Sequence, residues 1–260
     1  MPVETLEITR DDRDVTTVWL NRPEKHNALN APMMDDLRAM CDQVAHDGTR
    51  VLILAARGKS FCAGGDLTWM RAQFEAAPDE RDREGWRLAG MLRAINDLPM
   101  PVIGRLHGNA FGGGCGIAAV CDVAVALDGI KLGFTETKLG LIPATIGPYV
   151  MARMGPHKAR RVFMSSRVFG AREAVDLNLV SHTVAADGLD AAIEAEVAPY
   201  LACAPGAVAD AKALARQLSP VIDDAVLQQT ITALAARWEG DEAQDGISAF
   251  FEKRKASWVR

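Results

Sequence analysis

The hydrophobic positions predict strands that alternate with helices over the first two thirds of the chain. Residues 15–20 are β-branched and residues 51–55 are continuously apolar, as expected of strands, and Pro32 opens a helical pattern between them. Further strands are predicted at 101–106, 123–126 and 180–184, and further helices from glycines 112–114 to about 121, at 156–166 and at 171–177. Strands that alternate with helices indicate a parallel sheet in an α/β architecture.

Beyond about residue 189 the strand signals stop and only helical patterns remain. Helices are predicted at 189–203, 207–217, 221–239 and from about 244, with Pro205 and Pro220 as breaks. No low-complexity linker separates this part from the rest. We therefore expect one domain with a helical extension that serves as a lid or as a subunit-assembly element.

Composition and charge narrow the class of partner. The 260 residues are 49% hydrophobic and 24% charged, and the net charge of −5 argues against nucleic acid as the main partner. No apolar run approaches the roughly 18–20 residues that cross a membrane. The first 13 residues are polar and mixed in charge, so we do not expect a signal peptide.

Cysteine and histidine usage indicates neither disulfides nor a metal site. The five cysteines are an odd number without C-x-x-C spacing, and the five histidines show no H-x-x-x-H pair. We therefore expect free thiols, a reducing cytoplasm and no metal.

Two glycine-containing turns are candidates for chemistry. In residues 59–67, small residues precede Asp66, which can cap a helix that begins at about Leu67. In residues 109–116, three glycines follow a predicted strand and open a helix whose N–H groups could bind an anion. The second turn is not a dinucleotide fingerprint, because Ile117 stands where the last glycine belongs, and no G-K-[ST] follows as in a P-loop. Each turn alone is also compatible with a purely structural role, a tight turn with a helix N-cap for the first and close helix packing for the second.

Taken together, the two turns indicate an oxyanion hole. Each could direct one N–H at a single oxygen, an arrangement that stabilises a developing enolate.

These residues, in this order, resemble the crotonase (enoyl-CoA hydratase/isomerase) superfamily. The resemblance covers nearly the whole chain, at 21–29, 61–67, 107–114, 121–122, 136–143 and 251–254. It implies a crotonase-like spiral of repeated ββα units over 1–195 and a C-terminal helical trimerisation region over 196–260. It also implies a homotrimer or dimer of trimers, and an acyl-CoA thioester substrate without any separate cofactor.

The resemblance also assigns roles to individual residues. The oxyanion-hole donors are the N–H groups of Gly65 and Gly113, and the acid/base is Glu136. Met70 would face the acyl chain, although an ordinary core methionine is an equal alternative. The implied CoA and thioester path is lined by Lys25, Ala28, Ala63, Gly64, Asp66 and Leu67.

Gly116 is the main departure from the family. Hydratases of the familiar type have a second glutamate at this position, so their two-carboxylate mechanism cannot be transferred intact. Glu136 remains, in a β-like stretch at 133–137 beside the apolar residues 139–143. We expect an apolar pocket to raise its pKa, as suits a general acid/base, with a solvated surface glutamate as the alternative.

Residues 66–70 and 136–146 look like a bacterial branch of the superfamily. That branch includes methylglutaconyl-CoA and isohexenylglutaconyl-CoA hydratases of leucine and acyclic terpene breakdown, and its members often lack the first glutamate. Their substrates carry a second carboxylate, for which Arg71 or Lys138 is the candidate partner; either could equally be a solvated charge.

Other candidates are weaker. We expect His107 and Asp122 to have structural roles, and nothing basic is spaced to activate Cys62 or Cys115 as a nucleophile. Basic residues that could meet CoA phosphates, or equally form a solvated face, are Arg22, Lys25, Lys59 and residues 253–255.

The expected activity is hydration of a 2-enoyl-CoA, within fatty-acid-type metabolism. The first alternative is a Δ3,Δ2-enoyl-CoA isomerase, which needs only one carboxylate. An alternative of another class is a CoA-binding protein whose catalysis has decayed.

Overall fold

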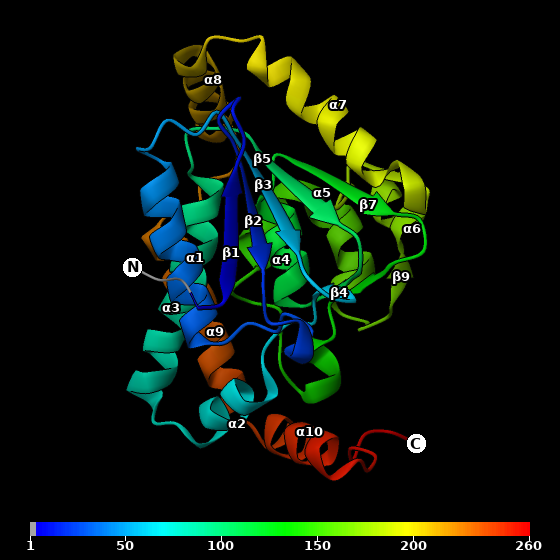
Figure 1. Cartoon of the computed structure of the whole chain (residues 1–260). Helices are drawn as coiled ribbons and strands as arrows, with labels where there is room; N and C mark the ends of the chain where they lie inside the picture. The colour runs from blue at the N-terminus through cyan, green and yellow to red at the C-terminus, as the bar shows by residue number, and fades with distance from the viewer. Residues whose placement is uncertain (1–3) are drawn as a thin grey trace.

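The computed structural model describes residues 4–260, which form two sheets and a surrounding set of helices (Figure 1). The larger sheet has the strand order β1-β2-β3-β5-β7-β10, with β1 antiparallel to β2 and the other neighbours parallel. Its strands are β1 (Leu6–Arg10), β2 (Val15–Leu20), β3 (Val51–Ala56), β5 (Val102–Leu106), β7 (Val123–Leu127) and β10 (His182–Val184).

The smaller sheet has the order β4-β6-β8-β9. Strands β4, β6 and β8 are parallel, and β9 pairs antiparallel with β8. Its strands are β4 (Ser60–Cys62), β6 (Asn109–Phe111), β8 (Lys131–Gly133) and β9 (Phe169–Gly170). Because neighbouring parallel strands end at the same edge, the segments after β4, β6 and β8 lie side by side.

A ββα unit repeats along the chain. The strand pairs β3–β4, β5–β6 and β7–β8 each place the first strand in the larger sheet and the second in the smaller one. A helix then returns the chain, because parallel strands need a crossover connection. These helices are α2 (Leu67–Glu75) with α3 (Pro78–Asn96), α4 (Gly113–Val120) and α5 (Gly147–Phe163).

Helices cover both faces of the larger sheet. On one face, Ile53, Ile103 and Val125 pack against Ile193 and Val197 of α7 (Leu189–Leu201), the yellow helix of Figure 1. The other face carries the main core, to which α1 (Ala31–Val44), α3 and α4 contribute. This double cover explains why every residue of β3 is buried and why its sequence is continuously apolar.

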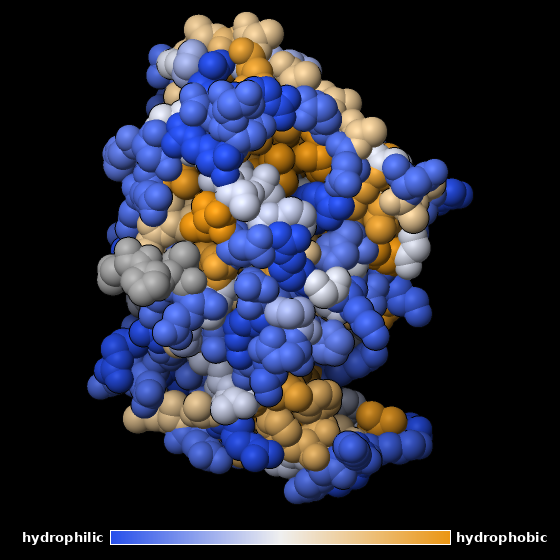
Figure 2. Space-filling model, viewed as in Figure 1, coloured by the Kyte–Doolittle hydropathy of each residue, from blue (hydrophilic) through white to orange (hydrophobic). Residues whose placement is uncertain are grey.

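The C-terminal helical extension reaches the opposite end of the molecule. Helix α8 (Pro205–Gln217) follows α7, α9 (Asp224–Trp238) packs on α3, and α10 (Asp241–Glu252) packs on the short 3-10 turn η2 (Glu136–Leu139). Figure 2 shows apolar surface where α10 meets the body, and Leu141, Trp238 and Ile247 belong to the buried apolar cluster there. None of the helices within residues 4–260 is long and apolar enough to cross a membrane.

The α/β class and the helical extension are confirmed. Five predicted strands are confirmed to within two residues at each end, namely those at 15–20, 51–55, 101–106, 123–126 and 180–184. The prediction of a β-like stretch at 133–137 is wrong. Strand β8 ends at Gly133, and the chain turns into η2, which closes at Gly140 with a left-handed φ of 72°. The range of α5 covers two helical segments divided at Gly155, whose φ of 73° and ψ of 152° are not helical. The second segment starts at Pro156, as predicted, and the first, from Gly147, was not predicted.

Several elements escaped the sequence analysis. Helix α3, strand β1 and the short strands of the smaller sheet were not predicted. The strands of that sheet are two or three residues long, too short to show an alternating pattern.

Candidate active site

Three expected site residues follow the three parallel strands of the smaller sheet. Gly65 comes after β4, Gly113 after β6 and Glu136 after β8. Because these strands end at one edge, residues far apart in the sequence meet there. The smaller sheet therefore assembles the site.

The two glycine turns lie in direct contact. Gly64 and Gly112 have positive φ values of 92° and 48°, which favour glycine. A Cβ added at Gly64 would lie 3.1 Å from the carbonyl oxygen of Phe111, and one added at Gly112 would lie 3.9 Å from the Cα of Gly64. A side chain at Gly64 would therefore push the turns apart.

Asp66 fixes the first turn, as its predicted capping role requires. Its Oδ1 accepts hydrogen bonds from the N–H groups of Thr68 (2.8 Å) and Trp69 (3.3 Å), and its Oδ2 accepts one from Arg22 (3.0 Å). Burial alone would raise the pKa of Asp66, but these hydrogen bonds hold it below its ordinary value. Arg22 also donates to the Ala28 carbonyl (2.6 Å), so it is engaged in structure at this turn.

The N–H groups of Gly65 and Gly113 remain available to a ligand. Leu29 donates to the Gly64 carbonyl (2.7 Å) and accepts from the Asp66 N–H (2.8 Å), so its two hydrogen bonds fall on either side of Gly65. Gly113 is the first residue of α4, where a helix leaves its N–H groups unpaired. Within residues 4–260, neither N–H has a backbone acceptor.

Both glycines line one apolar cavity of about 110 Å³. Its walls come from the glycine turns, from α2 and α3, from residues 136–146 and from α9. The lining residues are Leu29, Met34, Gly65, Trp69, Met70, Leu88, Gly113, Glu136, Leu141, Ile142, Pro143, Ala144, Thr145, Ile146, Leu234 and Trp238. An apolar cavity with a few polar groups is the usual form of a small-molecule site.

Glu136 presents its carboxylate to this cavity from beside the α4 turn. A Cβ added at Gly112 would lie 2.9 Å from Glu136 Oε1, so the carboxylate rests against the helix start. Its Oε2 is buried without a hydrogen-bond partner, although the residue as a whole is half-buried. Burial raises the pKa of Glu136 to about 7, and the N–H groups of Glu136 and Thr135 oppose the rise only in part. A carboxyl with this pKa can both accept and return a proton near neutral pH.

The C-terminal helices hold the Glu136 turn in place. The Gly140 carbonyl accepts two hydrogen bonds from Arg237 of α9, at 3.0 and 2.8 Å. A Cβ at Gly140 would lie 2.5 Å from the backbone of Glu242, and one at Gly246 would lie 2.7 Å from that of Leu139. The extension thus takes part in the site, which favours the first of its two expected roles, a lid; the boundary at 195/196 and the trimerisation role stay predictions.

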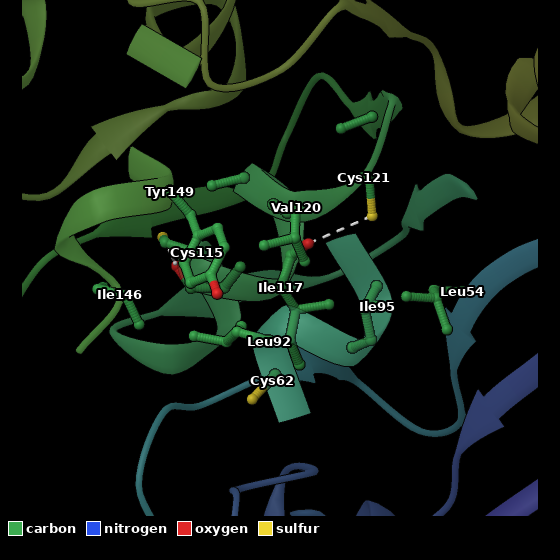
Figure 3. Packing of buried hydrophobic residues seen from close by; sticks show 14 of the residues in the cluster. Leu54, Cys62, Leu92, Ile95, Cys115, Ile117, Val120, Cys121, Ile146 and Tyr149 are labelled. Carbon is green, nitrogen blue, oxygen red and sulfur yellow. Dashed lines mark hydrogen bonds between the residues drawn. The ribbon is translucent and has the colours of Figure 1, made fainter. Parts of the chain in front are cut away.

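Ile146 fills the space beside Gly116. A Cβ at Gly116 would lie 2.5 Å from Ile146 Cγ2 and 3.7 Å from Leu92 Cδ2. Figure 3 shows Ile146 and Leu92 in the cluster of buried side chains that also includes Cys115 and Ile117 of α4. A second carboxylate at this position would collide with Ile146. The isoleucine can therefore occupy this space only because residue 116 is a glycine.

The remaining expected site residues fall into two groups. Met70 lines the cavity, as expected of a residue that faces an acyl chain. Ala28 and Gly64 are buried at the turns, whereas Lys25, Ala63 and Leu67 are exposed and lie outside the cavity lining. Their role along a CoA path stays a prediction.

The candidate partners for a second substrate carboxylate also lie outside the lining. Arg71 and Lys138 are exposed, and the Arg71 guanidinium stacks 4.5 Å from the Phe251 ring centre. Among the described residues, the cavity lining includes no lysine or arginine. The half-buried Arg81 lines a small adjoining cavity of about 20 Å³ and donates hydrogen bonds to the carbonyls of Gln73 and Phe74.

His107 and Asp122 make structural contacts. His107 Nε2 lies 2.8 Å from the Gly58 carbonyl oxygen, and Asp122 accepts hydrogen bonds from the Val102 N–H (2.7 Å) and Lys212 (2.6 Å). These contacts agree with the structural roles expected for both residues.

Cys62 and Cys115 are unsuited to nucleophilic attack. Both are buried, and burial raises the pKa of Cys62 to about 12 and that of Cys115 further still. In the described part of the chain, no three His, Cys, Asp or Glu side chains are grouped so as to hold a metal ion.

Comparison with known proteins places the chain among acyl-CoA enzymes. Residues 10–260 match the model of the enoyl-CoA hydratase/isomerase family. A crotonyl-CoA hydratase of Syntrophomonas wolfei is 28% identical, with 100% of this chain and 99% of the relative covered.

Solved structures of other proteins have a fold similar to that of this chain. An enoyl-CoA hydratase of Mycobacterium smegmatis is 35% identical, with both chains fully covered and a TM-score of 0.79. Pseudomonas aeruginosa AtuE is 34% identical, with 99% of this chain and 100% of that chain covered and a TM-score of 0.80. The expected crotonase-like fold is therefore confirmed.

Proposed function

The chain belongs to the enoyl-CoA hydratase/isomerase family, and from that premise we propose that it hydrates a 2-enoyl-CoA thioester with Glu136 as its single acid/base. The observation that carries this proposal is the buried, unpartnered Oε2 of Glu136, in an apolar cavity that also contains the Gly65 and Gly113 N–H groups. All three groups are polar and have no partner among residues 4–260, as a site that binds a polar reacting centre requires.

In the proposed reaction, the thioester oxygen accepts hydrogen bonds from the N–H groups of Gly65 and Gly113. Water adds its oxygen to the β-carbon, and its proton passes to the Glu136 carboxylate. The π electrons move to form an enolate, whose negative charge the two N–H groups stabilise. Glu136 then returns the proton to the α-carbon, so that one water is added across the double bond.

For the acyl group, we propose a branched glutaconyl-type chain, as in leucine or terpene breakdown. The similarity of residues 66–70 and 136–146 to that branch supports this choice. A second carboxylate would need a cation, and Arg81 beside the adjoining cavity is better placed than the exposed Arg71 or Lys138. As oligomeric state we propose a homotrimer or a dimer of trimers.

A Δ3,Δ2-enoyl-CoA isomerase is the second candidate. The specific observation in its favour is Ile146, which closes the position of a second carboxylate at Gly116. One carboxylate suffices to carry a proton between two carbons of an enolate. The same donors and the same Glu136 would serve either reaction.

Mass spectrometry of the purified protein with a panel of thioesters separates these functions. The panel contains crotonyl-CoA, a 3-enoyl-CoA and 3-methylglutaconyl-CoA. A mass gain of one water supports hydration and identifies the acyl group; a shifted double bond without mass change supports the isomerase. Binding of CoA thioesters without any reaction would favour the decayed CoA-binding protein.

The variant Glu136→Gln tests the acid/base assignment. It keeps the shape of the side chain but cannot accept or deliver the proton, so we expect kcat to fall by about 10²- to 10⁴-fold. Binding of CoA thioesters, followed by calorimetry, should persist. Turnover that survives this change would refute the assignment.

A further inference from the structure

A second polar atom in the cavity lacks a partner. Buried side-chain atoms without a hydrogen bond are few in residues 4–260, and two of them belong to residues that line the Glu136 cavity. One is Glu136 Oε2 and the other is Thr145 Oγ1; the rest are Arg93 Nε, His107 Nδ1 and Tyr149 OH. Leaving a buried hydroxyl unpaired destabilises a fold, so each such group calls for an explanation.

The position of Thr145 explains why its hydroxyl has no partner within the described residues. Thr145 is only 3% exposed and follows the apolar residues 141–144, which form the cavity wall after Glu136. Its neighbour Ile146 packs against Gly116, one helical turn beyond the Gly113 N–H. Thr145 lines the Glu136 cavity and also the small adjoining cavity of about 20 Å³, so its unpartnered side chain stands at the wall of the Glu136 cavity, in the segment that closes the position of the absent carboxylate.

We infer that Thr145 Oγ1 binds the oxygen atom that becomes the 3-hydroxyl group of the product. This inference rests on the proposed hydratase function. The attacking water needs at least two polar partners in an apolar cavity, and Glu136 provides one of them. A threonine hydroxyl can both donate and accept a hydrogen bond, so it can hold the water before the addition and the 3-hydroxyl after it.

The carboxylate of Glu136 and the hydroxyl of Thr145 have different roles because their chemistry differs. Glu136 takes one proton of the water and returns it to the α-carbon, while Thr145 accepts a hydrogen bond from the other O–H. No proton is transferred to or from Thr145. The site thus combines one carboxylate with one hydroxyl, and a side chain at Gly116 is unnecessary.

The test compares Thr145→Val with Thr145→Ser. Valine keeps the shape of threonine and removes the hydroxyl, so we expect kcat for hydration of crotonyl-CoA to fall roughly 10- to 100-fold, the range for a lost hydrogen bond in a reacting site. KM should change less than about threefold, since ground-state binding of the thioester is unaffected. Thr145→Ser retains the hydroxyl and should recover kcat to within about threefold.

Two further measurements separate this role from a structural one. The Tm of Thr145→Val should equal or exceed that of the wild type, because the variant loses an unpaired buried hydroxyl. Exchange of the α-protons of butyryl-CoA in D₂O, followed by mass spectrometry, needs the two N–H groups and Glu136 but no water addition. It should proceed at the wild-type rate in Thr145→Val.

The outcomes distinguish this inference from the function on which it rests. Wild-type hydration with an unchanged kcat in Thr145→Val would overturn the role of Thr145 alone. A raised KM confined to 3-methylglutaconyl-CoA would overturn it too, because Thr145 would then bind the distal acyl group. A wild type that hydrates no thioester, with Glu136→Gln no different, would overturn the proposed function and this inference with it.

Discussion

Replacing Gly116 by alanine tests whether Ile146 has closed the position at which familiar hydratases have their second glutamate. The added Cβ would lie 2.5 Å from Ile146 Cγ2 and 3.1 Å from Ile146 Cβ, well inside van der Waals contact. The contacted methyl belongs to a β-branched side chain, whose χ1 is stiff. The clash can therefore be relieved only by moving Ile146 or the helix.

The expected cost follows from two opposing effects. Overpacking a core by one methyl group typically costs about 1–3 kcal/mol. Alanine in place of a mid-helix glycine stabilises by about 0.5–1 kcal/mol. We expect the free energy of unfolding to fall by a net amount of about 1–2 kcal/mol, or roughly 2–8 °C in Tm for a domain of this size.

Matched substitutions at Ile146 isolate the clash. Ile146→Leu removes the methyl on Cβ, so the double variant Gly116→Ala/Ile146→Leu should be more stable than the sum of the single effects by about 1–2 kcal/mol. Ile146→Val keeps the clashing methyl, so its combination with Gly116→Ala should be near-additive. Gly206→Ala is the control for the glycine itself, because Gly206 lies in α8 with nothing within 4 Å of an added Cβ.

The assay is urea denaturation followed by tryptophan fluorescence, at one fixed protein concentration because association would shift the midpoint. The reasoning would be refuted if Gly116→Ala were as stable as the wild type and Gly206→Ala had the same stability as Gly116→Ala. It would also fail if Ile146→Val rescued Gly116→Ala as well as Ile146→Leu.

Three further predictions concern Glu136, the C-terminal helices and the cysteines. The pKa of Glu136 rises from 4.5 to about 7 on folding, so wild-type stability should fall as pH rises from 4.5 through 7. At about 1.4 kcal/mol per pH unit, Glu136→Gln should exceed the wild type by about 3 kcal/mol in urea denaturation at pH 8.5, and equal stability there would contradict the burial argument. Arg237→Ala removes both hydrogen bonds to the Gly140 carbonyl, so Tm and kcat should fall together, and less so in Arg237→Lys; an unchanged kcat would mean that α9 does not support the Glu136 turn. All five cysteines lie within the described residues, and only Cys203 is exposed. A thiol reagent should therefore label one thiol in the native protein and five in denaturant. Rapid labelling of more than one thiol in the native protein would contradict the burial of the other four.

The predictions that succeeded depend on interactions between residues close in sequence. Asp66 caps the helix that begins at Leu67, and its partners are the next two or three N–H groups. The glycines at 64 and 112 stand where a left-handed φ is needed, and such turns have a local sequence signature. The buried strand at 51–55 could be predicted because a continuously apolar run suits only a position between two layers.

The prediction for the Glu136 segment failed for a corresponding reason. Its apolar residues predict extended chain, but β8 ends at Gly133 and the following turn is shaped by contacts with α10, more than 100 residues later. The residues at 133–143 do not by themselves predict the hydrogen bonds that Arg237 makes with the Gly140 carbonyl. The backbone at the acid/base is therefore set by distant segments.

The sequence by itself determined the α/β class, the helical extension, the two glycine turns and the family to which they belong. Only the tertiary structure decided that Gly65, Gly113 and Glu136 line one cavity, that Ile146 fills the space at Gly116, and that Thr145, whose hydroxyl is unpaired, lines the same cavity. The physical reason is that turns and caps depend on a few neighbouring residues. Burial, and the pKa of Glu136 that depends on it, comes from side chains contributed by every part of the fold.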